Sequence, residues 1–205
     1  MKPCICLLAL LLAGPALATD IPDLSLSYAT IPSFGGSIWV SPGGNGPDMA
    51  HGFGAGGVPL DLRITLTVIS SDGSPIYLYP REDIWLESED GGLSFCIMGT
   101  APDSNTDQNG ETVFTGPFRA GGSNPAPEGL QVMISGMPLP QAPLPIQINS
   151  PDVNGDLVVN LSDIGAMTQS LFGEYDWRFD FNNDGAINLI DIVAFASSYG
   201  MHCGS

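Results

Sequence analysis

The chain has 205 residues and carries 22 acidic residues against 5 lysines and arginines, for a formal net charge of −17 at pH 7. A surface this acidic repels nucleic acid and anionic lipid and attracts divalent cations, so nucleic-acid binding is excluded.

The first 18 residues have the pattern of a secretory signal peptide. Lys2 supplies a positively charged start, an apolar centre follows from Ile5 to Leu12, and residues 16–18 form an A-x-A cleavage pattern. The apolar run is too short to span a bilayer, and no second such run follows it. We therefore expect cleavage near Ala18 and a secreted, extracellular protein with no membrane span.

Residues 20–149 are rich in Gly, Pro, Ser and Thr and contain short runs of β-forming residues. Alternation is clearest from Leu62 to Val68, where the even positions would face a core. Many short strands separated by turn residues, with no helical stretch, are typical of a β-sandwich. The expected strands are Leu24–Ala29, Ser37–Val40, Leu60–Ile69, Ile76–Tyr79, Ile84–Glu87, Leu93–Met98, Glu111–Thr115, Leu130–Ser135 and Pro145–Ile148.

Two stretches of this region carry a family resemblance. Residues 71–75 read S-D-G-S-P, and residues 106–114 read T-D-Q-N-G-E-T-V-F before the later strands. With these motifs the region resembles bacterial immunoglobulin-like domains of the invasin kind. The resemblance implies an immunoglobulin-like β-sandwich that serves as a spacer or adhesive module and is not catalytic. Residues 42–57 and 84–96 depart from the usual pattern, so the strand order stays open.

Aromatic residues in the same region leave a carbohydrate-binding function open. Rings gathered on one face of a sheet could stack on sugars. Trp39 and Trp85 each stand among apolar residues in expected strands, which favours core packing. Tyr77 and Tyr79 share one face of their expected strand and are better candidates for exposure. A carbohydrate-binding accessory protein is therefore the alternative function.

No residue pattern favours an enzyme. A paired-carboxylate glycosidase site would need two clusters facing each other across a cleft. Nothing in the sequence supports a Ser-His-Asp triad through His51. The G-x-G-x-x-G pattern of residues 52–57 is followed by a strand where a nucleotide site needs a helix N-terminus. The single acidic cluster consists of Glu82, Asp83, Glu87, Glu89 and Asp90.

Two cysteines remain after the signal peptide, Cys96 and Cys203. In an oxidising compartment they could form an intrachain bridge, or they could stay free or pair between molecules. The sequence gives no distance between them, so both alternatives stay open.

Residues 152–163 recur as residues 180–191, at an offset of 28 residues. In each copy, oxygen-bearing side chains occupy positions 1, 3, 5, 9 and 12 of a twelve-residue loop, and position 7 offers a backbone carbonyl. Calcium takes six to eight oxygen ligands, and this is how a calcium loop supplies them. The expected ligands are Asp152, Asn154, Asp156, Val158, Asn160 and Asp163 in the first loop, and Asp180, Asn182, Asp184, Ala186, Asn188 and Asp191 in the second.

Each loop runs into an apolar pattern with the period of a helix. The first pattern ends at Gly173 and the second at Gly200, so we expect two helices that pack their apolar faces together. The apolar positions are Leu161, Ile164, Met167 and Leu171 in the first, and Leu189, Ile192, Phe195 and Tyr199 in the second.

Duplicated loop-then-helix calcium motifs with no entering helix, and with Asp at position 12, resemble a type I dockerin. The resemblance covers residues 150–205 and implies a small all-α, EF-hand-like module that binds two calcium ions. It further implies a cohesin-like or other extracellular partner and a place in polysaccharide catabolism. The expected fold class is thus a mainly β immunoglobulin-like sandwich followed by this module. The expected function is a secreted, non-catalytic calcium-binding protein that uses the module for attachment or assembly.

The sequence departs from the dockerin pattern in two respects. Position 6 normally holds Gly, and the second loop has Gly185, but the first loop has Leu157. A left-handed backbone costs an L-residue roughly 1–2 kcal/mol, so we expect the first site to bind calcium more weakly. Positions 10 and 11, where small hydroxyl residues contact a cohesin, hold Leu161-Ser162 and Leu189-Ile190. The residues at positions 10 and 11 therefore argue against cohesin binding, but they do not affect the expectation of calcium binding.

Overall fold

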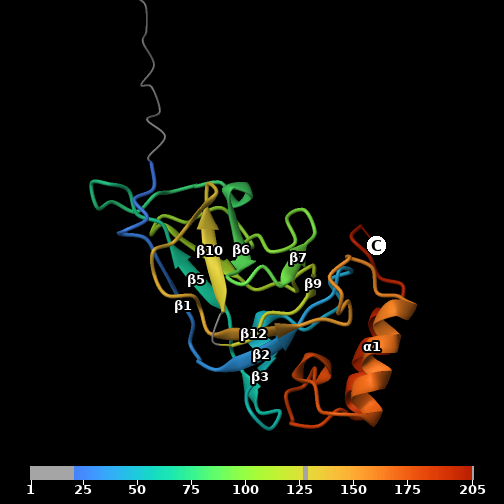
Figure 1. Cartoon of the computed structure of the whole chain (residues 1–205). Helices are drawn as coiled ribbons and strands as arrows, with labels where there is room; N and C mark the ends of the chain where they lie inside the picture. Colours follow the sequence, from blue (N-terminus) through green and yellow to red (C-terminus); the bar gives the residue numbers. More distant parts are fainter. Residues whose placement is uncertain (1–20, 127–128, 205) are drawn as a thin grey trace, which may run out of the picture.

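The computed structural model describes residues 21–126 and 129–204 (Figure 1). The expected signal peptide at residues 1–18 lies outside the described residues. In the described part of the chain, neither helix has the length and apolarity needed to cross a membrane.

Residues 21–149, hereafter the β region, form short strands in four sheets. The sheets have the orders β1-β5-β8, β11-β10-β6, β12-β2-β3-β4 and β7-β9. All described pairings are antiparallel except that of β12 with β2, which is parallel. The strands are β1 (Tyr28–Thr30), β2 (Gly36–Trp39), β3 (Gly52–Phe53), β4 (Pro59–Leu60), β5 (Ile64–Thr67), β6 (Ile84–Ser88), β7 (Leu93–Phe95), β8 (Glu111–Phe114), β9 (Ala120–Gly122), β10 (Leu130–Ile134), β11 (Met137–Pro138) and β12 (Ile146–Asn149).

One apolar core is shared by strands of all four sheets. The alternation predicted for β5 and its flanks is confirmed: Leu62, Ile64, Leu66 and Val68 are fully buried, whereas Arg63 between them is exposed. Fully buried Phe114 of β8, the partner of Ile64 across the ladder, fills the same core. The period-2 pattern thus identifies which face of this sheet is covered.

Several of the expected strands are wrong in type or extent. Leu60–Ile69 is divided into β4 and β5, and of Leu93–Met98 only the first three residues form a strand. Residues 76–79 form a turn, with Leu78 at φ 60°, and the hydroxyl of Thr106 accepts from the Tyr79 amide and donates to the Ile76 carbonyl. The segment therefore finds its partner in a distant loop and does not join a sheet. In Leu24–Ala29 only the last two residues are extended, because Asp23 accepts the amides of Ser25, Leu26 and Ser27 and closes a turn.

The last quarter of the chain contains α1 (Leu161–Phe172) and α2 (Leu189–Ser198), joined through the short 3-10 helix η3 (Trp177–Phe179). The expected end of α1 at Gly173 is confirmed, whereas α2 ends at Ser198, two residues before Gly200. A second apolar core lies between the helices and the β region. Its buried members are Val159, Met167, Phe179, Phe181 and Phe195.

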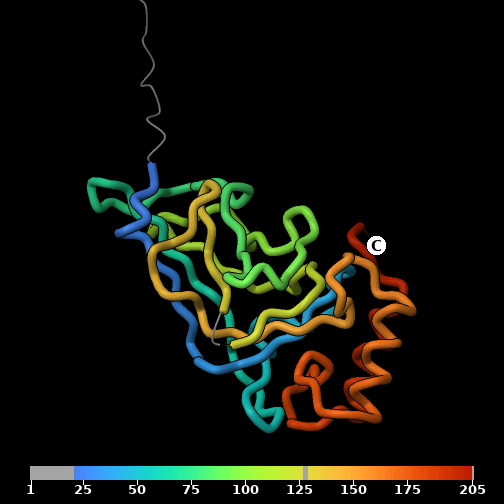
Figure 2. The backbone as a smooth tube through the Cα atoms, viewed as in Figure 1, coloured from blue at the N-terminus to red at the C-terminus, as the bar shows by residue number. Residues whose placement is uncertain are grey.

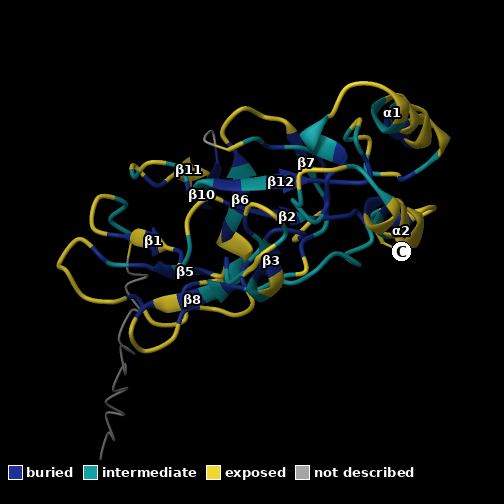
Figure 3. Cartoon of the chain, turned by 90° about the horizontal axis from the view of Figure 1, so that it is seen from below, coloured by how far each residue is buried: buried dark blue, intermediate teal, exposed yellow. Residues whose placement is uncertain are grey.

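The helices lie beside the β region (Figures 1 and 2). Several contacts besides the chain itself join the two parts. Trp39, at the end of β2, packs against Phe181 in the second core, with ring centroids 6.1 Å apart. The Asn45 side chain donates to the Ser197 carbonyl at the end of α2. Cys96 and Cys203 form a disulfide, which resolves the alternatives that the sequence left open. The helices therefore lie against one end of the β region, with their outer faces exposed (Figure 3).

Candidate metal centre

The two predicted calcium loops have the same backbone hydrogen-bond arrangement. In the first, the carboxylate of Asp152 accepts from the Asp156 amide at 3.2 Å and the Leu157 amide at 2.8 Å. In the second, Asp180 accepts from the Asp184 and Gly185 amides at 3.1 and 2.8 Å. The carboxylate at position 1 therefore organises the turn through positions 5 and 6 in both loops.

The carboxylate at position 12 connects each loop to its helix. Asp163 accepts the Val153 amide at 2.9 Å through one oxygen and the Asn160 amide at 2.9 Å through the other. Asp191 makes the equivalent bonds to Phe181 and Asn188 in the second loop. Asn160 and Asn188 in turn cap α1 and α2 in capping boxes. The ninth and twelfth positions thus fix where each helix begins.

Position 6 is left-handed in both loops, as the sequence predicts. Leu157 has φ 66° and Gly185 has φ 89°. Position 4 is left-handed too, with Gly155 at φ 71° and Asn183 at φ 54°. Each loop therefore has one glycine at these two positions, but only the first loop places a large apolar residue in a conformation that disfavours a side chain.

The carboxylates at positions 1 and 12 are buried: Asp152, Asp163, Asp180 and Asp191 are each at most 1% exposed. No described arginine or histidine forms an ion pair with any of them. Burial raises the pKa of Asp152 to about 6; repulsion from Asp163 and Asp156 adds to this, while the Leu157 amide opposes it. Burial also raises the pKa of Asp191. Buried carboxylates without a cationic partner are costly unless a cation offsets their charge.

The donor set of each loop fits a hard divalent cation. All of the predicted ligands are oxygens of carboxylates, amides or a backbone carbonyl, the chemistry that calcium prefers. Each hydrogen-bonded carboxylate oxygen keeps a further lone pair for a metal. Among the described residues, however, no three His, Cys, Asp or Glu side chains gather closely enough to hold a metal ion by themselves. Calcium binding by these loops therefore stays a prediction.

Several residues outside the predicted calcium loops support them. The Tyr175 hydroxyl donates to Asp180 at 2.8 Å, and burial raises the pKa of Tyr175. The buried Asn149 amide, at the end of β12, donates to the Asp180 carbonyl at 2.9 Å. Gly57, in the β3–β4 turn, donates to the Asn183 carbonyl at 2.9 Å. None of these lies within a loop, so the twelve-residue pattern carries no signal for them.

The residues considered for other functions do not form a second site. Tyr79 is buried, and its hydroxyl bonds to Ser135 at 2.6 Å, so the expectation that it is exposed was wrong. Tyr77 is exposed, as expected, but lies in a turn. Trp39 packs towards the helices, and the Trp85 indole donates to Glu87 at 2.7 Å. In the described structure the four rings therefore do not share one strand face.

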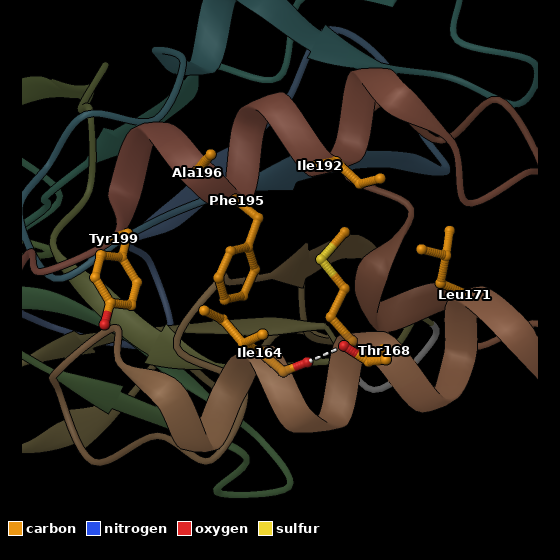
Figure 4. A pocket seen from close by; sticks show the side chains of 8 residues that line it. Ile164, Thr168, Leu171, Ile192, Phe195, Ala196 and Tyr199 are labelled. Atoms are coloured by element: carbon orange, nitrogen blue, oxygen red, sulfur yellow. Dashed lines mark hydrogen bonds between the residues drawn. The ribbon is translucent and has the colours of Figure 1, made fainter.

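An apolar groove of about 440 Å³ separates α1 from α2. Figure 4 shows Ile164 and Leu171 of α1 opposite Ile192 and Phe195 of α2, with Tyr199 at one end. The expected packing of the two apolar faces is confirmed only for Met167 and Phe195, which are buried in the second core. Ile164, Ile192 and Tyr199 line the groove and are 38%, 37% and 50% exposed. The first apolar position of each pattern differs, because Leu161 and Leu189 are 72% and 71% exposed.

Comparison with known proteins gives little to add. No protein-family model and no curated protein matches the chain. Among solved structures, the crystal structure of the Lin-41 filamin domain is similar over 62% of this chain and 96% of that chain, with 16% sequence identity and a TM-score of 0.30.

Proposed function

We propose that this protein is a secreted, non-catalytic calcium-binding protein. In this proposal an immunoglobulin-like β-sandwich, formed by the β region, carries a dockerin-like module with two calcium loops. The observation that carries the proposal is the repetition of one loop geometry at an offset of 28 residues. In both copies the carboxylate at position 1 accepts the amide of position 5, and the residues at positions 9 and 12 form the capping box of the following helix. Chance turns would not be expected to repeat both the ligand spacing and the hydrogen bonds.

Calcium would act on folding. When bound, the cation supplies positive charge among carboxylates that otherwise repel one another. Asp163 and Asp191 then fix the start of each helix, and the apolar faces of α1 and α2 come together. Because ligand binding to the folded form stabilises it, the helices should depend on calcium.

The outer faces of the helices support a role in attachment. Leu189, Ile190 and Val193, close together in the first half of α2, are all more than half exposed. Leu161, at the start of α1, is exposed as well. Exposed apolar residues gathered on one part of a surface are typical of protein contact sites. We assign this face to an extracellular protein partner, for which a cohesin-like protein is the candidate that the dockerin resemblance implies. No observation favours the carbohydrate-binding alternative over this one.

The decisive experiment is a calcium titration of the mature chain by calorimetry, with tryptophan fluorescence recorded in parallel. Trp177 lies three residues before the second loop and should report its closure. We expect two binding events of unequal affinity and loss of helical circular dichroism in chelator. Asp156→Asn and Asp184→Asn should each remove one event. Absence of any calcium binding by the parent chain would refute the proposal.

A further inference from the structure

The first calcium loop is held on one side by the two-stranded β7–β9 sheet. The Gly122 amide donates to the Asp152 carbonyl at 2.6 Å. At Gly121 an added Cβ would lie 1.8 Å from Oδ2 of Asp152, so only glycine allows this carboxylate its position. Gly155 of the loop faces Ser94 of β7, the residue paired with Gly121.

On its other side the same loop pairs with the C-terminal tail. The Val159 amide donates to the Met201 carbonyl at 3.0 Å, and the Gly200 amide donates to the Val159 carbonyl at 2.9 Å. Val158, whose carbonyl is the predicted ligand at position 7, forms a β-bridge with His202. The orientation of that carbonyl therefore depends on where the tail lies.

The tail is in turn bonded to the β7–β9 sheet, which contacts the start of the loop. Cys203, one residue beyond the bridge, is bonded to Cys96, which directly follows β7. The Cys96 amide donates to the Arg119 carbonyl just before β9, at 3.0 Å. The first loop thus contacts β9 and the C-terminal tail through hydrogen bonds, and the disulfide links that tail to the residue after β7.

The second loop has a different set of supports. Its contacts outside the loop include hydrogen bonds from Gly57, Tyr175 and Asn149 and the ring of Trp39 against Phe181, and none of these four residues is adjacent to a cysteine. The two loops are alike internally but are supported by different parts of the chain.

We propose that the Cys96–Cys203 bond and the β9 glycines are positioning elements of the first calcium loop, so that loss of the disulfide weakens the first site and spares the second. This inference rests on the proposed function, in that the loops bind calcium. Groups that orient metal ligands from outside the coordination shell affect metal affinity by about 10–100-fold.

The test uses the full mature chain with the two loops separated by substitution. Asp184→Asn isolates the first site and Asp156→Asn isolates the second. Into each background the pair Cys96→Ser and Cys203→Ser is introduced, and calcium is titrated by calorimetry. We expect calcium affinity to fall by about tenfold or more at the first site and by less than about twofold at the second. Equal loss at both sites, or no loss at either, would overturn the inference.

A substitution that keeps the disulfide gives an independent variant. Gly121→Ala should displace the Asp152 carboxylate and weaken the first site alone. Gly165→Ala is the matched control, because a Cβ at this position in α1 meets no neighbouring atom within 4 Å. If Gly121→Ala leaves first-site affinity at the level of this control, β9 does not position the loop.

Amide hydrogen exchange in chelator separates this inference from the proposed function. The Leu157 and Val159 amides should exchange faster in the cysteine-free protein, whereas Gly185 of the second loop should be unchanged. Protection of Leu66 in β5 verifies that the β region remains folded. If the parent chain binds no calcium, the proposed function fails, yet faster exchange confined to the first loop would still support the positioning role. Unchanged exchange would contradict it.

Discussion

Leu157 is the residue at which the two loops differ most in backbone strain. It is half-buried and left-handed at φ 66°, a conformation that costs an L-residue roughly 1–2 kcal/mol. Its counterpart Gly185 adopts the same region freely. The two loops therefore differ in backbone strain at position 6.

Replacing Leu157 by glycine should strengthen the first calcium site. The free energy released by removing the backbone strain exceeds the free energy lost to the greater freedom of glycine in the unfolded chain. We therefore expect calcium binding at the first site to gain about 1 kcal/mol, or roughly fivefold in affinity. Calorimetry in the Asp184→Asn background measures it. Asn183→Gly is the matched control in the second loop, because Asn tolerates a left-handed backbone and should gain less. A larger gain for Asn183→Gly would contradict this explanation.

The capping asparagines have a role that does not require metal. Asn160 accepts the Ser162 amide at 2.8 Å, and Asn160→Ala leaves that amide without its partner. In chelator we expect a loss of about 1 kcal/mol in the free energy of unfolding of the helical part, measured by urea titration of the circular dichroism signal. Asn160→Ser should retain most of the stability, since serine also caps helices. Equal losses for both would mean that the cap contributes little.

At the scale of elements, α1 and α2 depend on each other through the side chains in their groove. Phe195 is 5% exposed and contacts the second core, so Phe195→Ala should lower the free energy of unfolding by about 3–5 kcal/mol. Val193, two residues earlier and 61% exposed, is the control, and Val193→Ala should change stability by less than about 0.5 kcal/mol. Thermal denaturation followed at 222 nm compares the two variants. Similar midpoints would show that the groove does not hold the helices together.

The elements that the sequence predicted well are those with a strong period. The buried alternation around β5 and the capped starts of both helices follow from side-chain pattern and local hydrogen bonds. Strand β9 could not be predicted, because Ala120-Gly121-Gly122 has no β-forming residue and exists only through its pairing with β7. The prediction for Ile76–Tyr79 was wrong for the opposite reason: its composition favours a strand, but most of its backbone hydrogen bonds are made with the hydroxyl and the backbone of Thr106.

For the molecule as a whole, the helices and the β region share a core. Trp39→Ala should therefore lower the thermal stability of the helices, by about 2 kcal/mol for a half-buried ring, even though it lies in β2. Trp85, also half-buried but in β6, provides the control. Trp85→Ala should destabilise the β region while leaving the calcium dependence of the helical signal intact. Circular dichroism and hydrogen exchange, which follow the unfolding of the helices and of the β region, distinguish the two variants. Identical effects of the two substitutions would argue against a shared core.

The candidate site was predictable in its ligand types but not in its surroundings. The spacing of acidic and amide residues is a local pattern, so both loops were found in the sequence. The supports come from residues far away in the chain, such as Gly57, Gly121 and Asn149, which only the folded arrangement brings to the loops. The disulfide was left open for the same reason, since its cysteines are 107 residues apart.

The parallel pairing of β12 with β2 determines how the molecule resists pulling. Ile146 to Asn149 run beside Gly36 to Trp39 in the same direction, with Asn149 next to Trp39 at the end that faces the helices. A force drawing the helices away from the earlier strands therefore pulls β12 lengthwise along β2, so that all the hydrogen bonds of the pair are loaded together and not one after another. A force applied at Cys203 instead passes through the disulfide to Cys96 and bypasses this pair. The chain thus transmits tension by two routes, one through a shear-loaded strand pair and one through a covalent bond.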